Sequence, residues 1–173
     1  MRTTDGEVGL RLYRAGDRDR LVAIADNPNV ARTLADRFPH PYAREDAENW
    51  LARVKTETRP CNMAIEWRGE LVGGIGIEPM ADVHSGTAEL GYWLGEPYWG
   101  KGIATRAAGL IISYAFDELL FIRLQASVFA GNPASCRVLE KNGFVREGVL
   151  RKHIRKNGRI RDAFLYARLR SPG

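Results

Sequence analysis

The clearest pattern in the chain is an alternating strand followed by a helical repeat. Apolar and other side chains alternate over residues 88–94, which predicts a half-buried strand. The apolar face of this strand consists of Ala88, Leu90, Tyr92 and Leu94. Apolar residues then recur at three- and four-residue spacing over residues 103–115, the period of an amphipathic helix. The helix is predicted to begin near Gly102.

The rest of the chain also divides into strand and helix patterns. Strand patterns cover residues 8–13, 62–67, 71–77, 122–128, 144–155 and 160–169, and helix patterns cover 17–25, 30–38, 44–54 and 133–142. The side chains expected to cap helices are Asp17, Asn27 and Asn132. Asn157-Gly158 suits a tight hairpin turn, and the glycines at 73–76 predict a bulge or close packing. We expect one α/β domain with a mixed sheet over residues 1–173.

A loop with two glycines joins the strand at 88–94 to the helix that follows it. The first N–H groups of a helix have no partner within it, and the helix dipole adds partial positive charge at that end. Gly100 and Gly102 allow the backbone to approach an anion closely, and Lys101 stands between them. The sequence therefore predicts a cradle for a pyrophosphate.

Two common phosphate-binding loops do not fit these residues. The segment from Gly95 matches a P-loop for seven positions, but Gly102 occupies the place of the Mg²⁺-binding Ser or Thr. A dinucleotide fingerprint requires a third glycine where Thr105 stands, and it requires a first strand-helix-strand unit. Nucleotide hydrolysis and dinucleotide binding are thus excluded, which leaves coenzyme A.

Several segments resemble one enzyme superfamily. Residues 99–104 resemble the acyl-CoA pyrophosphate loop of the GNAT N-acetyltransferases, with Trp99 where Gln or Arg is usual. That tryptophan, preceded by residues 89–94, is similar to the ribosomal-protein (Rim-type) branch of the superfamily. Residues 132–144 resemble the second cofactor segment of this branch, and residues 158–166 resemble its closing hairpin. The resemblance covers almost the whole chain in order.

This resemblance implies a fold, an activity and a set of cofactor contacts. The implied fold is a mixed, mostly antiparallel sheet of about seven strands with helices on both faces. The implied activity is transfer of the acetyl group of acetyl-CoA to a primary amine by direct attack in a ternary complex, with no metal. The implied cofactor contacts are Trp93, Leu94, Trp99, Gly100, Lys101, Gly102, Ile103, Ala104, Thr105 and Asn132. A backbone N–H near Trp93 and Leu94 would polarise the thioester carbonyl.

The attacking amine must be neutral, so the reaction needs a group that accepts a proton. Glu89 is the candidate, because it is the lone carboxylate of an apolar strand and is expected to be partly desolvated. The alternative is that Glu89 pairs with an arginine on the sheet. Asp82 and His84, in the loop before the strand, are weaker substitutes.

The thiol side of the reaction has its own candidate. Ser135 is the nearest hydroxyl in the second cofactor segment and would hydrogen-bond the coenzyme sulfur; alternatively it is an ordinary first-turn serine. Many GNAT enzymes use a tyrosine for the leaving thiolate, at the position that Leu139 occupies here. Cys136 is expected to be a small buried residue, since direct attack needs no acyl-enzyme.

The acceptor is the least determined part of the sequence. By resemblance, Phe38 and Tyr42 line the acceptor groove, although either would serve equally in the core. Rim-type relatives acetylate protein N-termini, including ribosomal proteins, whereas other relatives modify polyamines, antibiotics or amino acids. Two other functions stay open: a non-catalytic acyl-CoA-binding domain, and an RNA- or ribosome-binding protein that uses the basic residues at 151–161.

Composition adds little to this picture. The net charge of +5 over 173 residues is typical of ordinary solvated faces. Two cysteines, no long apolar run and no signal-like N-terminus favour a cytoplasmic protein without a membrane segment. A monomer and a homodimer are both compatible with the sequence.

Overall fold

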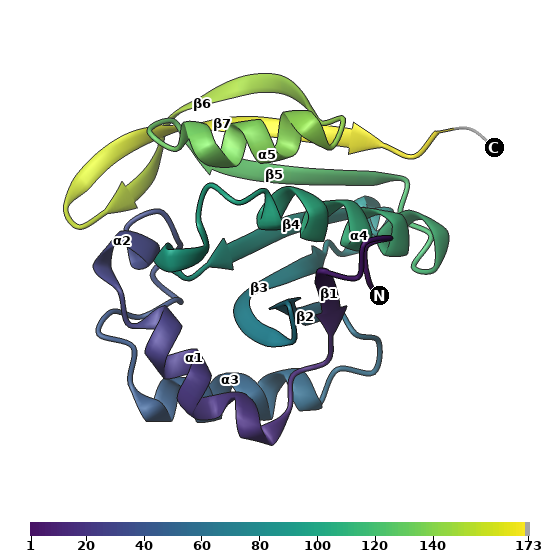
Figure 1. Cartoon of the computed structure of the whole chain (residues 1–173). Coiled ribbons are helices and arrows are strands. Elements are labelled where there is room, and N and C mark those ends of the chain that lie inside the picture. The colour runs from purple at the N-terminus through teal and green to yellow at the C-terminus, as the bar shows by residue number, and fades with distance from the viewer. Residues whose placement is uncertain (172–173) are drawn as a thin grey trace.

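A seven-stranded sheet forms the centre of the computed structural model, which describes residues 1–171 (Figure 1). From edge to edge the strands are β1 (Val8–Arg11), β2 (Asn62–Trp67), β3 (Glu70–Pro79), β4 (Thr87–Leu94), β5 (Arg123–Phe129), β7 (Arg159–Leu169) and β6 (Val145–Lys156). All neighbouring pairs are antiparallel except β4–β5, which is parallel. The expected mixed and mostly antiparallel sheet is confirmed.

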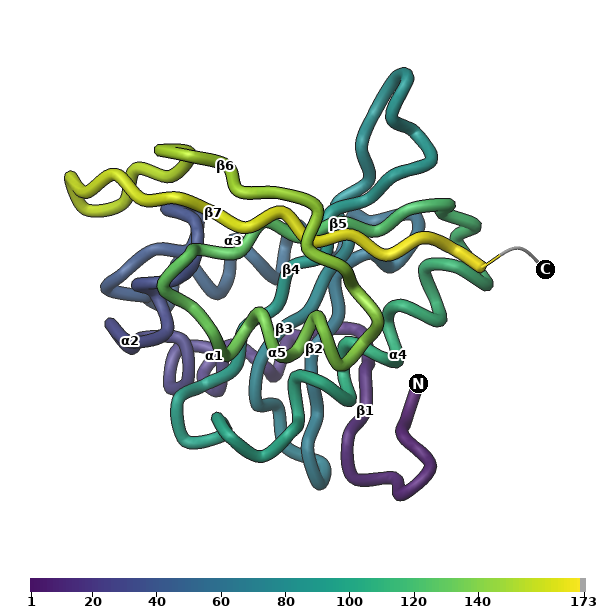
Figure 2. Tube along the Cα trace, turned by 90° about the horizontal axis from the view of Figure 1, so that it is seen from above, coloured from purple at the N-terminus to yellow at the C-terminus, as the bar shows by residue number. Residues whose placement is uncertain are grey.

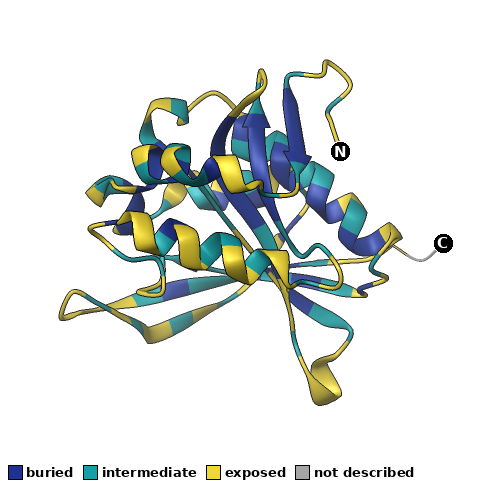
Figure 3. Ribbon diagram, turned by 90° about the horizontal axis from the view of Figure 1, so that it is seen from below, coloured by how far each residue is buried: buried dark blue, intermediate teal, exposed yellow. Residues whose placement is uncertain are grey.

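Helices cover both faces of this sheet. They are α1 (Arg18–Ala25), α2 (Pro28–Ala31), α3 (Arg44–Lys55), α4 (Ile103–Asp117) and α5 (Pro133–Lys141), with short 3₁₀ turns at Ala15–Asp17, Asp82–His84 and Glu96–Tyr98. Helices α4 and α5 enclose one core, which includes Leu90 and Ile111, and α1 and α3 enclose a second core with Leu21 and Ala64. Figure 3 shows buried residues on the strands and on the inner sides of the helices. Within residues 1–171, no helix has the length and apolarity needed to cross a membrane.

The helix expected over residues 30–38 is wrong in extent. Asn27 caps α2 as expected, because its side chain accepts two N–H groups of the first turn, but the helix ends at Ala31 and turns follow. Phe38 packs its ring against Trp93, with 5.1 Å between the ring centroids. This long-range contact places Phe38 against the sheet, and sequence periodicity does not reveal it.

Asp17 does not cap α1 as expected. Its carboxylate accepts the backbone N–H of Arg14 at 2.7 Å and pairs with the Arg11 guanidinium at 2.7 Å. Arg11 also reaches Glu66 at 2.6 Å, and the three charged side chains are at most 15% exposed. Burial alone would raise the pKa of Asp17, but the hydrogen bonds from Arg11 and Arg14 outweigh burial and lower it. Asp17, Arg11 and Glu66 together therefore join the start of α1 to β1 and β2.

Glycines in β3 permit very close packing of the central strands. A side chain at Gly73 would collide with the backbone carbonyl of Trp93, and one at Gly74 would collide with the hydroxyl of Tyr13. The register of the β2–β3 pair also shifts at this segment, where Ile65 pairs with Gly73 and Glu66 pairs with Leu71, so that β3 carries one extra residue. Both consequences expected of the glycine run, close packing and a bulge, are thus present.

Replacing Asp17 by Asn is expected to lower the free energy of unfolding by about 3 kcal/mol at neutral pH, because the buried Arg11 loses one of its two carboxylates. The pKa of Asp17 is lowered in the fold, so its ionic contribution is complete above the unfolded value of about 3.9 and is lost as the pH falls below it. Urea unfolding at about pH 7 and about pH 3 measures the loss and its decrease in acid.

The matched control is Asp19→Asn, in the first turn of α1. The Asp19 side chain is 78% exposed in its pair with Arg18, so its loss should change stability by less than about 0.5 kcal/mol. Equal effects of the two substitutions would contradict a structural role for the buried pair.

Candidate active site

The sheet is interrupted between its two central strands. Pairing of β4 with β5 ends at Glu89 and Gln125, although β4 continues to Leu94 and β5 to Phe129. Figure 1 shows the two strands diverging past this point. A cleft of about 1980 Å³ occupies this region and extends to the N-termini of α4 and α5 and to the segment after α2.

Backbone N–H groups on one edge of β4 face this gap. Gly95 donates its N–H to the carbonyl of Val72 on β3, and the β3–β4 register is unbroken. Because the direction of the N–H alternates along a strand, the N–H groups of Tyr92 and Leu94 face the gap, while that of Trp93 faces β3. Of the two residues expected to offer an N–H here, only Leu94 has that orientation.

The loop before α4 has the geometry of an anion cradle. Gly100 and Gly102 have φ values of +74° and +71°, the left-handed region that favours glycine, and a Cβ at either position would meet nothing within 4 Å. The first backbone bond of the helix runs from the N–H of Arg106 to the carbonyl of Gly102. The N–H groups of residues 103–105 therefore lack partners within the helix. They and the loop border the cleft.

Unlike the two glycines of the loop, Trp99 and Lys101 have side chains that are held by contacts within the protein. The indole Nε1 of Trp99 donates to the carbonyl of Leu94 at 2.8 Å, which ties the loop to the end of β4. Lys101 does not line the cleft; its ammonium lies 5.0 Å from the ring centre of Trp67 and 5.6 Å from that of Tyr98. The lysine expected beside a pyrophosphate is thus engaged on the far side of the loop.

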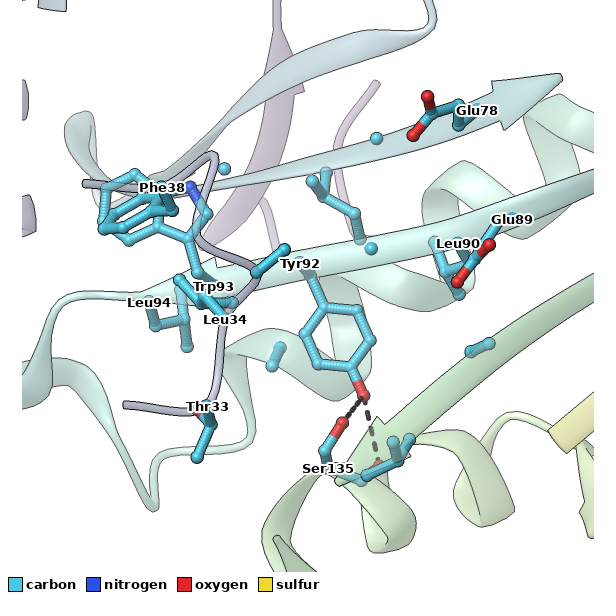
Figure 4. A pocket seen from close by; sticks show the side chains of 18 of the residues that line it. Thr33, Leu34, Phe38, Glu78, Glu89, Leu90, Tyr92, Trp93, Leu94 and Ser135 are labelled. Atoms are coloured by element: carbon cyan, nitrogen blue, oxygen red, sulfur yellow. Dashed lines mark hydrogen bonds between the residues drawn. The ribbon is translucent and has the colours of Figure 1, made fainter. Parts of the chain in front are cut away.

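Glu89 lies at the mouth of the gap, where the pairing of β4 with β5 ends. Because side chains alternate along a strand, that of Glu89 points to the face opposite Leu90 and Tyr92. Glu89 lines the cleft (Figure 4). The residue is exposed, so the expected desolvation is absent from this structure. Among residues 1–171 no arginine pairs with it, whereas its cross-strand neighbour Glu78 pairs with Arg37 at 2.9 Å. Glu89 is therefore a carboxylate free to meet a ligand.

Asp82 and His84 stand apart from this cleft. They form the exposed 3₁₀ turn before β4, and neither lines the cleft. The turn precedes the strand on the side away from the α4 loop, so the two residues are not gathered with the other candidates. The structure thus leaves Glu89 as the candidate acid–base group of this segment.

Tyr92 is a site residue that the sequence analysis did not single out. Its hydroxyl lies 2.8 Å from Ser135 Oγ and donates to the Ser135 carbonyl at 3.1 Å (Figure 4). Asn132 caps α5 as expected, because its Oδ1 accepts the N–H of Ser135 at 3.2 Å. Burial raises the pKa of Tyr92. The sequence signal that could have identified Tyr92 was a phenol on the apolar face of an alternating strand, because a buried tyrosine hydroxyl usually has a hydrogen-bond partner.

Aromatic and basic residues form the other wall of the cleft. Phe38 packs against Tyr42, with ring centroids 5.2 Å apart, and Tyr42 is buried. Burial raises the pKa of Tyr42 to about 12, so Tyr42 supports the wall as a neutral phenol. The tip of the β6–β7 hairpin lies on the same side of the molecule as α2 in Figure 2, and Lys156 pairs with Asp36 at 2.7 Å. His153 and residues 154–156 of the hairpin also line the cleft.

The chain is similar to known acetyltransferases over most of its length. The model of the acetyltransferase (GNAT) domain matches residues 7–145. The chain is 38% identical over 166 residues to YoaA of Bacillus subtilis, an uncharacterized N-acetyltransferase, with 91% of this chain and 90% of that protein covered. It is 31% identical over 177 residues to the putative ribosomal N-acetyltransferase YdaF of the same species, with 94% and 91% covered.

Solved structures have the same architecture. Mycobacterium smegmatis RimJ in complex with CoA-disulfide superposes with a TM-score of 0.82 at 28% sequence identity. The match covers 94% of this chain and 81% of that chain. Within residues 1–171, no group of three or more His, Cys, Asp and Glu side chains is arranged to hold a metal ion.

Proposed function

The chain belongs to the acetyltransferase (GNAT) domain family and is an acetyl-CoA-dependent N-acetyltransferase, and we propose that it acetylates the N-terminal amine of a protein or peptide by direct attack. The gap between β4 and β5 carries this proposal. Glu89 borders the gap on the face of α1 and α3, and Ser135 borders it on the face of α4 and α5. An amine and a thioester brought in from opposite faces would meet there.

The loop before α4 fits a pyrophosphate. It offers unpaired N–H groups beside open space, and the α4 dipole adds positive charge. The residues proposed to hold the pyrophosphate are Gly100, Gly102, Ile103, Ala104 and Thr105. Trp99 fixes the loop through its bond to Leu94, and Lys101 contributes charge from behind the loop.

The pantetheine arm would follow the unpaired edge of β4. The N–H of Leu94 faces the gap and is the proposed donor to the thioester carbonyl oxygen, on which charge develops during attack. The amide NH₂ of Asn132 is the proposed donor to the arm, because the capping bond uses only its oxygen. Trp93 turns its N–H to β3 and packs its ring against Phe38, so its proposed role lies on the acceptor side.

Acetyl-CoA supplies the activated acyl carbon. The protein must remove a proton from the amine and stabilise the negative charge that develops on the thioester carbonyl oxygen. A primary amine is protonated near neutral pH, so it attacks only after a proton has been removed. Glu89 is the proposed acceptor of that proton, directly or through a water molecule. Its exposed position at the cleft allows an amine to approach it.

The environments of the two cysteines favour direct attack over an acyl-enzyme. Cys61 lines the cleft, but burial raises the pKa of its thiol, and the thiolate is the nucleophilic form. Cys136 is buried and does not line the cleft. Neither cysteine has the exposed, electropositive setting of a nucleophile that forms an acyl-enzyme.

A peptide acceptor is favoured by the open floor of the cleft and by the description of one relative. The floor beside Glu89 is Gly91, where a Cβ would meet nothing within 4 Å. The wall opposite this floor is built from the segment after α2 and from the β6–β7 hairpin, with Phe38 and Tyr42 lining it. YdaF, which is similar along nearly the whole chain, is described as a putative ribosomal N-acetyltransferase.

Ala104→Asp should weaken acetyl-CoA binding at least tenfold, or about 1.4 kcal/mol, because it places a negative charge in the first turn of α4 beside the phosphates. The same charge interacts favourably with the helix dipole, which offsets part of the cost of a larger polar side chain at this half-buried position. Ala104→Asn is the matched control of equal size and should retain most of the affinity. Titration calorimetry with acetyl-CoA measures both.

Ligand-induced stabilisation gives the same test a second readout. Acetyl-CoA at about 100 times the wild-type Kd should stabilise the wild type by about 2.7 kcal/mol, and at the same concentration Ala104→Asp should lose about half of that gain or more. Equal affinity for the Asp and Asn variants would remove this loop from the cofactor site.

Glu89→Gln should lower kcat by roughly 10²- to 10⁴-fold while the Kd for acetyl-CoA stays the same, since a general base contributes about this factor. Steady-state rates of coenzyme A release, with calorimetry for the Kd, measure the two quantities. Glu78→Gln is the matched control, because Glu78 is the cross-strand neighbour and its carboxylate pairs with Arg37. If both variants turn over at the wild-type rate, Glu89 is a structural residue of the sheet.

A panel of N-terminal peptides and small primary amines, including a polyamine and an amino acid, tests the acceptor. The peptides should give the highest kcat/KM, measured by coenzyme A release and mass spectrometry of the product. Gly91→Val should raise the KM for the peptide and leave the Kd for acetyl-CoA unchanged, because Val suits a strand and would occupy the open floor. Turnover of small amines alone would overturn the peptide assignment and leave the acetyltransferase assignment standing.

A further inference from the structure

Leu139 occupies the position at which many GNAT enzymes have a tyrosine that serves the leaving thiolate. Its side chain lies on the inner face of α5 and is fully buried in the hydrophobic core. A phenol nevertheless reaches the thiol side of the cleft from another element. Tyr92 extends from β4 across the gap to the first turn of α5, where its hydroxyl contacts Ser135 (Figure 4). Both residues line the cleft.

We infer that Tyr92 is a positioning residue, which holds the Ser135 hydroxyl so that the serine donates a hydrogen bond to the departing coenzyme A sulfur. This inference rests on the proposed function, because it assigns the thiol side of that same cleft. In the reaction the C–N bond forms and the C–S bond breaks. The electron pair stays on sulfur as a thiolate, and the proton of the amine goes to Glu89.

Two anchors fix Ser135 in place. The side chain of Asn132 accepts its N–H at 3.2 Å, which sets the first turn of α5. The Tyr92 hydroxyl lies 2.8 Å from its Oγ and 3.1 Å from its carbonyl oxygen. The backbone and the hydroxyl of the serine are thus held from two different elements, β4 and the turn before α5.

The Tyr92 hydroxyl has one proton and two acceptors within reach, so two arrangements exist. In the first, the tyrosine donates to the Ser135 carbonyl, and the serine donates to the phenol oxygen. In the second, the tyrosine donates to Ser135 Oγ, and the serine proton is directed to a group outside the pair. An anionic sulfur favours the second arrangement, because each O–H then polarises the next one. Rotation of two hydroxyls suffices, and no heavy atom has to move.

The burial of Tyr92 limits it to this supporting role. Loss of the phenol proton would leave a buried phenolate, and burial raises the pKa of Tyr92. A tyrosine that keeps its proton remains a donor to Ser135 throughout the reaction. The arrangement therefore stabilises the thiolate by hydrogen bonds and needs no proton transfer from the tyrosine.

The test compares Tyr92→Phe, Ser135→Ala and the double variant. Ser135→Ala should lower kcat roughly 100-fold, the range for loss of one donor to a developing anion, and Tyr92→Phe should lower it about tenfold. KM for the amine should be unchanged in both. In the double variant, Tyr92→Phe should have no further effect, because its action passes through the serine.

A binding measurement without turnover supplies the second readout. The thiol of coenzyme A bound to the enzyme is titrated by its thiolate absorbance in the ultraviolet. Donors to sulfur favour the thiolate, so the pKa of the bound thiol should rise in Ser135→Ala and in Tyr92→Phe relative to the wild type.

Tyr166→Phe is the matched control for fold effects. The Tyr166 hydroxyl also bonds to α5, to Glu140 at 2.8 Å, but it does not line the cleft. This variant should leave kcat and the titration of the bound thiol unchanged. If Tyr92→Phe behaves like Tyr166→Phe, or lowers kcat by the same factor in the Ser135→Ala background as in the wild type, the inference is overturned. A wild type that neither binds coenzyme A nor releases it with any amine would instead overturn the proposed function.

Discussion

The end of the β4–β5 pairing is the constraint on which the rest of the site depends. Each strand is held on its other edge, β4 by β3 along its length and β5 by β7 from Arg123 to Phe129. The right-handed twist of a sheet rotates neighbouring strands, so two well-anchored halves diverge once their shared ladder stops after Glu89. The divergence exposes N–H groups of β4 that a continuous sheet would have paired. A backbone donor is thereby offered to a ligand without any strained residue.

Alternation along β4 then divides the chemistry between the two faces of the sheet. Glu89 and Trp93 lie on the face of α1 and α3, while Tyr92 lies on the face of α4 and α5. Because neighbouring residues of a strand point to opposite faces, a carboxylate on the proposed amine side and a phenol on the proposed thiol side fit within four positions. A shift of one residue in the register would exchange the two faces and disable both.

Local sequence patterns predicted much of this fold, whereas the features that depend on contacts between distant residues were not predicted. The strand at 88–94, the helix from Gly102, the Asn132 cap and the hairpin turn at Asn157-Gly158 depend on spacing and backbone preference within a few residues, and all are confirmed. The helix expected over residues 30–38 ends at Ala31, because the segment that follows packs against the sheet through Phe38. Other differences have the same origin.

The pairing of Arg11 with Glu66, 55 positions away, depends on how the chain returns on itself, as does the placement of Lys101 over Trp67. The bond between Tyr92 and Ser135 joins residues 43 positions apart. Periodicity correctly assigned Tyr92 to the buried face, but it carries no information on what the phenol meets there. Sequence patterns thus located the elements of the site and missed the contacts between them.

The two sides of the cleft differ in how firmly they are held. The proposed cofactor side is built into the sheet and α4, through the bond of Trp99 to Leu94 and the buried first turn at Ile103. The proposed acceptor side is bordered by the β6–β7 hairpin, whose ion pair to the segment after α2 joins a Lys156 side chain that is 11% exposed to an Asp36 side chain that is 76% exposed. One ion pair whose carboxylate lies in solvent holds this wall less firmly than the hydrogen-bonded strands and buried helix turn hold the other side. Under the proposed function, this difference between the two sides would suit an acceptor larger than a small amine, such as a polypeptide end.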